Sequence, residues 1–211
     1  MLKEKTRIAV FVSGGGTNLQ ALLDEAARGN LPDGEIALVV SSKADAYALT
    51  RAANASVPGV VVARKQCADQ AEFEGKILDA LREYRIEMIV LAGFMSILSE
   101  SFTSRFPRRI LNVHPSLIPA FCGQGFYGLK VHEAALERGV KISGATVHFV
   151  NEIPDGGEIV FQRAVEVQPG DTPETLQRRI MEEAEWHLLP AAAEKVARDI
   201  RENADYDKMD L

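Results

Sequence analysis

The fold is decided by residues 7–18, which read RIAVFVSGGGTN. Residues 7–13 form an almost unbroken apolar run, which predicts a strand with both faces covered. Glycines 14–16 then turn the chain into a helix whose apolar residues recur at the helical period: Leu19, Leu22, Leu23 and Ala26. A strand, a glycine loop and a helix in this order predict an α/β sheet.

Strands and helices continue to alternate up to about residue 138. Further strands are predicted at residues 36–40, 60–62, 88–92 and 109–113, and further helices at 44–53, 69–84 and 131–138. Asp69, with Glu72 three residues later, is typical of a helix N-terminus. Because parallel strands need long crossover connections, this alternation predicts a Rossmann-like, doubly wound and mostly parallel sheet.

The pattern changes in the C-terminal part of the chain. Residues 142–150 and 159–167 are β-rich runs joined by an acidic glycine turn, which predicts antiparallel strands appended to the sheet. Thr172, Pro173 and Glu174 predict the start of a long final helix, with threonine as N-cap and proline at the first position. We expect one domain over residues 1–202 and a loose polar tail at 203–211.

Composition and charge limit the classes of function. The chain has 211 residues, 46% of them hydrophobic, and a formal net charge of −6, which argues against wrapping nucleic acid or binding an anionic membrane. Cys67 and Cys122 lack the spacing of a zinc site or a disulfide framework, so no metal is expected. The apolar run from Ile8 to Val12 is too short for a signal peptide or membrane span. We expect a cytoplasmic protein that acts on small molecules, and the sequence leaves a homodimer open.

The loop SGGGTN at residues 13–18 is a candidate anion site. It joins the first strand to the first helix, where backbone N–H groups and the helix dipole favour negative charge. No Gly-Lys-Ser/Thr follows, and the third glycine of the dinucleotide fingerprint is absent, so one monophosphate is favoured over a dinucleotide. The alternative is an ordinary tight turn.

Three polar residues, Asn112, His114 and Asp155, are candidates for catalysis. Asn112 and His114 are two apart in a predicted strand and project to the same side, and Pro115 ends that strand. An amide donor and an imidazolium could stabilise the oxyanion that forms when an amine attacks a carbonyl carbon, and a nearby carboxylate favours the charged imidazole. Asp155 would be that carboxylate.

Structural roles for the same residues stay open. A lone histidine near a strand end is more often a satisfied structural residue, Asn112 could form an Asx turn, and Asp155 fits an ordinary turn. The chain has no G-x-S-x-G motif and no obvious activated cysteine. Direct attack by the substrate's own amine is therefore favoured over a covalent enzyme intermediate.

The segment LAGFMSIL at residues 91–98 stays apolar beyond the predicted end of its strand. Such a continuation could line a slot for a flat heterocycle bound through backbone groups. Taken alone, however, the segment favours ordinary core.

Five motifs together resemble the glycinamide ribonucleotide (phosphoribosylglycinamide) formyltransferases, folate-dependent enzymes of purine biosynthesis. They are SGGGTNLQ at 13–20, LAGFM at 91–95, LNVHPSL at 111–117, GATVHFV at 144–150 and DGG at 155–157. The resemblance runs along nearly the whole chain. It implies the formyltransferase fold and transfer of a formyl group from 10-formyltetrahydrofolate to the glycinamide amine of a phosphoribosyl substrate.

The resemblance also implies roles for individual residues. It places Asn112, His114 and Asp155 at the catalytic centre, with Asp155 tuning His114 and an ordered water relaying protons. The substrate phosphate maps to Gly16, Thr17 and Asn18, the glycinamide end to Glu185, and the folate to Met95, Ser96, Ile97, Leu98 and Asn112. The phosphate-binding half would span about residues 1–105, and the folate and catalytic half about 106–202.

Some positions depart from the commoner family pattern. Ser96 stands where an arginine often follows the methionine, and Gln70 stands about where many relatives carry a basic residue near the folate. The loop at residues 122–130 looks longer than the usual connection, and could be a lid or an expanded turn.

Related families give competing hypotheses. Methionyl-tRNA formyltransferase carries an additional C-terminal domain for its RNA, whereas this chain is acidic and ends earlier. Formyltetrahydrofolate deformylase uses water as acceptor and normally has an N-terminal regulatory domain, whereas the first strand here begins at about residue 7. A silent nucleotide-binding module is a third hypothesis, which the complete set of Asn112, His114 and Asp155 disfavours.

Overall fold

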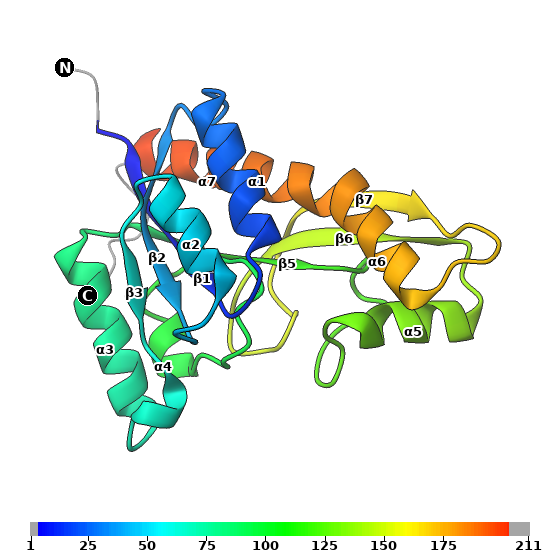
Figure 1. Cartoon of the computed structure of the whole chain (residues 1–211), viewed down its shortest axis with the longest axis horizontal. Helices are drawn as coiled ribbons and strands as arrows, with labels where there is room; N and C mark the ends of the chain where they lie inside the picture. Colours follow the sequence, from blue (N-terminus) through cyan, green and yellow to red (C-terminus); the bar gives the residue numbers. More distant parts are fainter. Residues whose placement is uncertain (1–3, 203–211) are drawn as a thin grey trace.

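A computed structural model describes residues 4–202 of the chain and shows one seven-stranded sheet of order β3-β2-β1-β4-β5-β6-β7 (Figure 1). The strands are β1 (Thr6–Val12), β2 (Gly34–Ser41), β3 (Gly59–Val61), β4 (Met88–Leu91), β5 (Ile110–His114), β6 (Ile142–Phe149) and β7 (Ile159–Glu166). The first five strands pair in parallel, and β6 and β7 add to β5 in antiparallel orientation. The predicted fold class is confirmed.

The helices are α1 (Thr17–Ala27), α2 (Tyr47–Asn54), α3 (Gln70–Glu83), α4 (Glu100–Thr103), α5 (Leu129–Arg138), α6 (Pro173–Ile180) and α7 (Trp186–Glu202). The helix expected from residue 44 begins only at Tyr47, because Ala46 before it has an extended backbone. The short helix α4 and a 3₁₀ turn at Arg64–Gln66 were not expected from the sequence. Both are too short to show a helical period.

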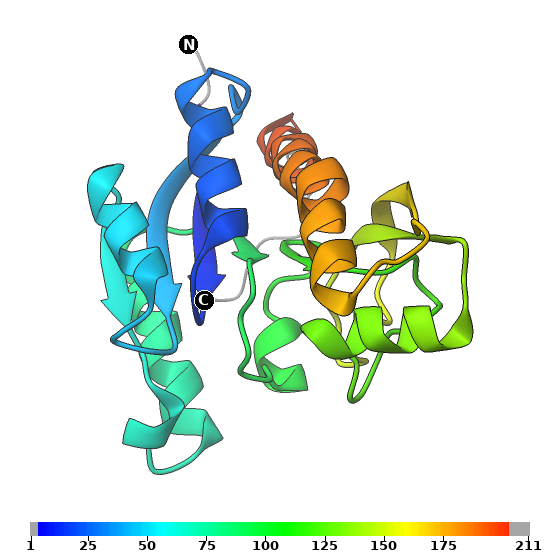
Figure 2. The same ribbon diagram turned by 45° about the vertical axis from the view of Figure 1, so that its right-hand side comes forward.

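Helices cover both faces of the parallel sheet, so β1, β2 and β4 are buried almost throughout without alternation, whereas the edge strand β3 is exposed or half-buried (Figures 1 and 2). One core cluster joins the strands to α1, α2 and α7. A second cluster packs α3 and Phe102 of α4 against the opposite face. A third forms where β6 and β7 meet α5 and α6.

Two predicted helix starts are confirmed at the level of single hydrogen bonds. The side chain of Asp69 accepts a hydrogen bond from the Glu72 backbone N–H at 2.8 Å and caps α3. Thr172 caps α6 in a reciprocal capping box with Thr175, and Pro173 occupies the first turn. These signals are local in sequence, which is why they could be read from it.

The long C-terminal helix is interrupted. A π-helical turn at Met181–Glu185 separates α6 from α7, although the apolar period suggested one continuous helix. Such turns insert an extra residue and are frequent at functional sites. This turn ends on the buried Glu185.

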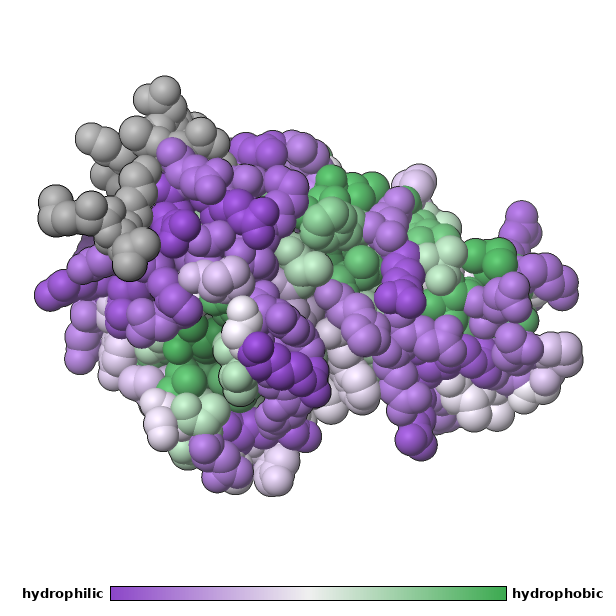
Figure 3. Space-filling view, turned by 90° about the horizontal axis from the view of Figure 1, so that it is seen from above, coloured by the Kyte–Doolittle hydropathy of each residue, from purple (hydrophilic) through white to green (hydrophobic). Residues whose placement is uncertain are grey.

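The surface seen from above is mostly hydrophilic, with separate hydrophobic patches (Figure 3). Within residues 4–202 we find no helix with the length and apolar character needed to cross a membrane. The same residues contain no group of three or more histidine, cysteine or acidic side chains arranged to hold a metal ion. The tail expected at residues 203–211 lies outside the described part of the chain.

Candidate active site

Strand β5 carries two of the candidate residues, as the two-residue spacing predicts. Asn112 is half-buried, and His114, the last residue of the strand, is 4% exposed. Both lie at the carboxyl end of a strand that is parallel to β4 and antiparallel to β6. Ligands bind at this edge of open α/β sheets.

Asp155 reaches the same place from the connection between β6 and β7. Its φ of +55° is left-handed, and Gly157 lets the loop pass so close to β6 that an added Cβ would lie 1.8 Å from the Phe149 carbonyl oxygen. Oδ2 of Asp155 lies 3.5 Å from Nδ1 of His114. Two segments far apart in the chain therefore bring Asn112, His114 and Asp155 to one place.

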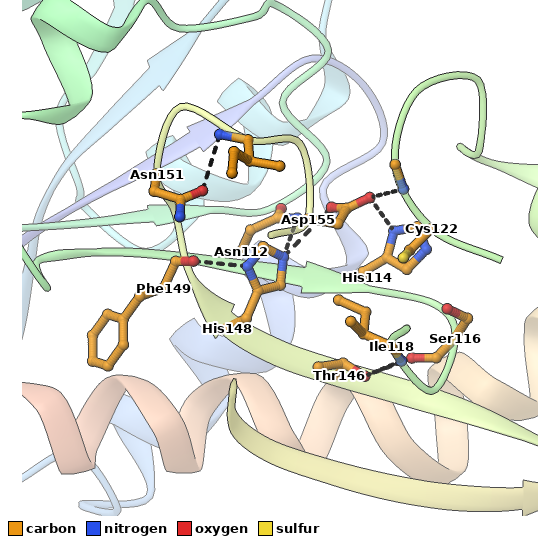
Figure 4. A network of polar contacts seen from close by, with 12 residues as sticks. Asn112, His114, Ser116, Ile118, Cys122, Thr146, His148, Phe149, Asn151 and Asp155 are labelled. Carbon is orange, nitrogen blue, oxygen red and sulfur yellow. Dashed lines mark hydrogen bonds and ion pairs between the residues drawn. The ribbon is translucent and has the colours of Figure 1, made fainter. Parts of the chain in front are cut away.

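A fourth polar side chain, His148, completes this cluster. His148 lies opposite Asn112 in the β5–β6 register, and its Nε2 is 3.3 Å from Nδ2 of Asn112. The same Nε2 is 3.5 Å from Oδ1 of Asp155, so the carboxylate lies between two histidines (Figure 4). A role for His148 was not predicted from the sequence, although the residue lies in the motif GATVHFV; pairing that motif with LNVHPSL across two strands would have indicated it.

The backbone after β5 closes around the cluster. Nε2 of His114 lies 2.8 Å from the carbonyl oxygen of Phe121, and the Gly123 N–H donates to Oδ2 of Asp155 at 2.8 Å. A carbonyl and a carboxylate are both acceptors, so both ring nitrogens of His114 face acceptors. Only the doubly protonated imidazolium gives a donor to each.

The environment of Asp155 favours its charged form. Burial would raise the pKa of this carboxyl, but hydrogen bonds from His148 and from the Gly123 N–H, with the charges of His114 and His148, lower the pKa below its usual range. The carboxylate therefore stays ionised at neutral pH and offers acceptor oxygens to both histidine rings.

A cavity of about 320 Å³ opens beside this cluster. Its lining includes Thr17, Asn18, Met95, Asn112, His114, Asp155 and Glu185, together with Phe126 and Tyr127 of the loop before α5. The cavity thus joins the glycine loop, β5, the acidic turn and the π-helical turn. A small molecule in it would touch all four.

Glu185 is the second titratable group in this cavity. It is 6% exposed, and Asn18 donates from Nδ2 to its Oε2 at 2.7 Å. Burial raises the pKa of Glu185 to about 6, against which the Asn18 hydrogen bond acts. Oδ1 of Asn18 is buried and has no hydrogen-bond partner within the described residues, which leaves an acceptor for a ligand.

The glycine loop keeps the start of α1 open. Gly16 is the N-cap, with φ +72° and no side-chain capping bond. The side chain of Arg51 holds the loop by donating from Nε to the Gly15 carbonyl oxygen at 2.8 Å. An uncapped helix N-terminus with a nearby guanidinium suits a phosphate, so the phosphate site at this loop stays a prediction. The contact of Arg51 with the loop was not predicted from the sequence.

A model of the formyl transferase family matches residues 6–192. The chain belongs to this formyl transferase family. It is 44% identical to the phosphoribosylglycinamide formyltransferase of Haemophilus influenzae over 184 residues, which cover 87% of this chain and 84% of that protein. The family resemblance seen in the five motifs is confirmed.

Other relatives of this formyl transferase are longer. It is 45% identical to the trifunctional purine biosynthetic protein adenosine-3 of Gallus gallus over 92% of its own length, but it spans only 18% of that protein. Among solved structures it is similar to glycinamide ribonucleotide transformylase 1 from Symbiobacterium toebii, with a TM-score of 0.86 and 42% identity. That match covers 92% of this chain and 89% of the other.

The segment predicted to hold the folate lies at the cavity only in part. Met95 of this formyl transferase lines the cavity, whereas Ser96, Ile97 and Leu98 lie beyond its lining. Met95 is 59% exposed and Ile97 is 83% exposed, so the interpretation of the whole segment as ordinary core is wrong for these two residues. Leu98 is half-buried and packs on the core.

Proposed function

We propose that this chain transfers a formyl group from 10-formyltetrahydrofolate, used as a co-substrate, to the amine of glycinamide ribonucleotide in purine biosynthesis. The observation that carries the proposal is the convergence of Asn112, His114 and Asp155 on a cavity that also contains the glycine loop. Relatives named for this activity support it.

The chemistry follows from the donors in the cavity. The substrate amine attacks the formyl carbon, a C–N bond forms, and the formyl oxygen takes up negative charge. Asn112 and a protonated His114 ring would stabilise that oxygen, and Asp155 would hold the ring in place through Nδ1. Collapse of the adduct breaks the bond to N10 of the folate, and the proton lost by the amine passes to N10, by way of an ordered water in our proposal.

The backbone at Phe121 takes part in this step. Nε2 of His114 faces the Phe121 carbonyl oxygen. Nε2 can donate to the formyl oxygen only if it gives up this contact with Phe121. We therefore propose that substrate binding shifts the 121–123 backbone away from the ring.

Each part of the two substrates is assigned to a region of the site by its charge or its apolar character. The phosphate belongs at the open start of α1, at Gly16, Thr17 and Asn18, and the acceptor amine belongs near Glu185. The folate is placed at Asn112 and Met95, which line the cavity, and along Ser96, Ile97 and Leu98, which continue from Met95 beyond its lining. We propose one formyltransferase domain over residues 1–202, acting on small molecules and placed in the cytoplasm, where its free cysteines would stay reduced.

The deciding experiment offers 10-formyltetrahydrofolate to the purified chain with three acceptors in turn: glycinamide ribonucleotide, formyl-accepting tRNA and water. We expect transfer to glycinamide ribonucleotide to be fastest by a wide margin. Faster transfer to tRNA or to water would overturn the assignment in favour of the corresponding relative.

A further inference from the structure

The segment that connects β4 to α4, residues 92–99, combines exposed apolar side chains with a firmly held backbone. Met95 and Ile97 project outward, at 59% and 83% exposure. A loop without regular secondary structure must satisfy its backbone polar groups in other ways. In this segment, side chains of Ser13, the residue after β1, and of two residues of α3 do so.

The first anchor is at Met95. Ser13, at the end of β1, is 4% exposed, and its Oγ accepts a hydrogen bond from the Met95 N–H at 2.9 Å. Ser13 Oγ is also 2.6 Å from Ser42 Oγ, which fixes its direction. The start of the segment is thereby tied to the carboxyl end of the inner strand β1.

The second anchor is Glu74 of α3, a carboxyl that is 5% exposed and has no place in the proposed chemistry. Its Oε1 accepts from the Ser99 N–H at 2.6 Å, and its Oε2 accepts from the Ser99 hydroxyl at 2.6 Å. Gln70 extends the link, because its Nε2 donates to Glu74 Oε1 at 2.7 Å and to the Ile97 carbonyl oxygen at 2.9 Å. Figure 1 shows α3 beside α4 at this edge of the molecule.

The contacts of Glu74 occupy both of its carboxyl oxygens. The Gln70 NH₂ group and the Ser99 N–H, which can only donate, meet at Oε1, and the Ser99 hydroxyl donates to Oε2. A glutamine would turn an NH₂ group toward one of the donors at Oε1, or would force the Ser99 hydroxyl to rotate and accept. Burying a carboxyl is unfavourable unless its hydrogen bonds are satisfied. Glu74 satisfies its hydrogen bonds through Ser99 and Gln70, so its burial favours the observed position of residues 97–99.

We propose that Glu74 is a positioning residue for the formyl donor: through Ser99 and Gln70 it holds Met95 and Ile97 in place as an apolar ledge for the ring system of the folate. This inference rests on the proposed function. It assigns to Glu74 an effect on donor binding, with no contact to the reacting atoms.

The test compares Glu74→Gln with Asp79→Asn, a control on the same helix whose side chain is 76% exposed and paired with Arg82. For Glu74→Gln we expect the KM for 10-formyltetrahydrofolate to rise about tenfold, the effect of losing one or two hydrogen bonds. The KM for glycinamide ribonucleotide, and kcat at saturating donor, should stay within about twofold of wild type. Amide hydrogens of residues 95–99 should exchange faster, and the control should match wild type in every measurement.

A second variant guards against misfolding of the first. Gln70→Ala removes the links to Ile97, Glu74 and Arg64 at the half-exposed start of α3 but leaves both contacts of Glu74 with Ser99, and we expect a smaller rise in the same KM. An unchanged donor KM in Glu74→Gln, or an equal rise in both KM values, would overturn the proposal. Failure of the wild type to use the folate donor would instead overturn the proposed function, and the exchange rates would still show whether Glu74 holds residues 95–99.

Discussion

His148 lies directly across the β5–β6 pair from Asn112, with its Nε2 3.3 Å from the amide nitrogen of Asn112. Nδ1 of the ring is 2.8 Å from the carbonyl oxygen of Phe149, so Nδ1 carries a proton, and Nε2 faces both the Asn112 amide and Oδ1 of Asp155. The amide of Asn112 is thus held against a ring that the neighbouring strand positions.

Replacement of His148 should therefore impair turnover by releasing Asn112. For His148→Ala we expect kcat to fall about tenfold, the effect of losing one oriented hydrogen bond, with smaller changes in both KM values. Steady-state kinetics check this, with His187→Ala, an exposed histidine at the start of α7, as control. Wild-type turnover in His148→Ala would show that Asn112 needs no partner.

Asp155 should affect the rate more than it affects binding. In Asp155→Asn the carboxylate opposite His114 is lost, and an NH₂ group can face the Gly123 N–H. We expect kcat to fall about 10²- to 10⁴-fold, while the Kd for glycinamide ribonucleotide changes little. Calorimetric titration alongside kinetics separates the two. Equal losses in binding and rate would make Asp155 chiefly structural.

Glu185 should control a pH-dependent step near pH 6. Its pKa is raised by burial to about 6 from an ordinary 4.5, so the folded chain keeps a proton that the unfolded chain releases. The resulting stability is present below pH 4.5 and is lost as pH rises through 6, by about 2 kcal/mol. Glu185→Gln should remove this loss in urea unfolding. In the same variant, the affinity for glycinamide ribonucleotide should not increase between pH 5 and pH 7. If the affinity of the variant still increases as in wild type, another group causes the increase.

His132 should make the fold sensitive to acid. It lies fully buried on α5, both ring nitrogens have no hydrogen-bond partner among the described residues, and burial lowers its pKa to about 4 from 6.5. The unfolded chain binds the proton more readily, so stability is intact above pH 6.5 and falls as pH drops toward 4, by up to about 3 kcal/mol. His132→Leu should flatten this dependence in urea unfolding between pH 7 and pH 5, whereas His187→Gln should not.

The parts of the site that the sequence predicts are those set by local rules. Asn112 and His114 follow from strand periodicity and from the proline after them, and the glycine loop follows from its place between strand and helix. His148 and Glu74 depend on pairings between segments far apart in the chain, which no local pattern records. The Phe121 carbonyl is a group that every residue carries, so only the folded backbone could single it out.

The glycine loop allows a matched pair of substitutions that tests phosphate binding. At Gly16, with φ +72°, an added Cβ would lie 2.6 Å from Cβ of Ala48, whereas at Gly15 nothing lies within 4 Å of it. Gly16→Ala should therefore displace the start of α1 from α2 and lower the stability by about 1–3 kcal/mol. The same displacement misaligns the N–H groups of Thr17 and Asn18, so the KM for glycinamide ribonucleotide should rise at least about tenfold. Gly15→Ala keeps the contact between the backbone carbonyl of residue 15 and Arg51. This variant should therefore bind glycinamide ribonucleotide, and unfold, like wild type. If both variants bind the phosphate substrate as wild type does, the phosphate lies elsewhere in the cavity.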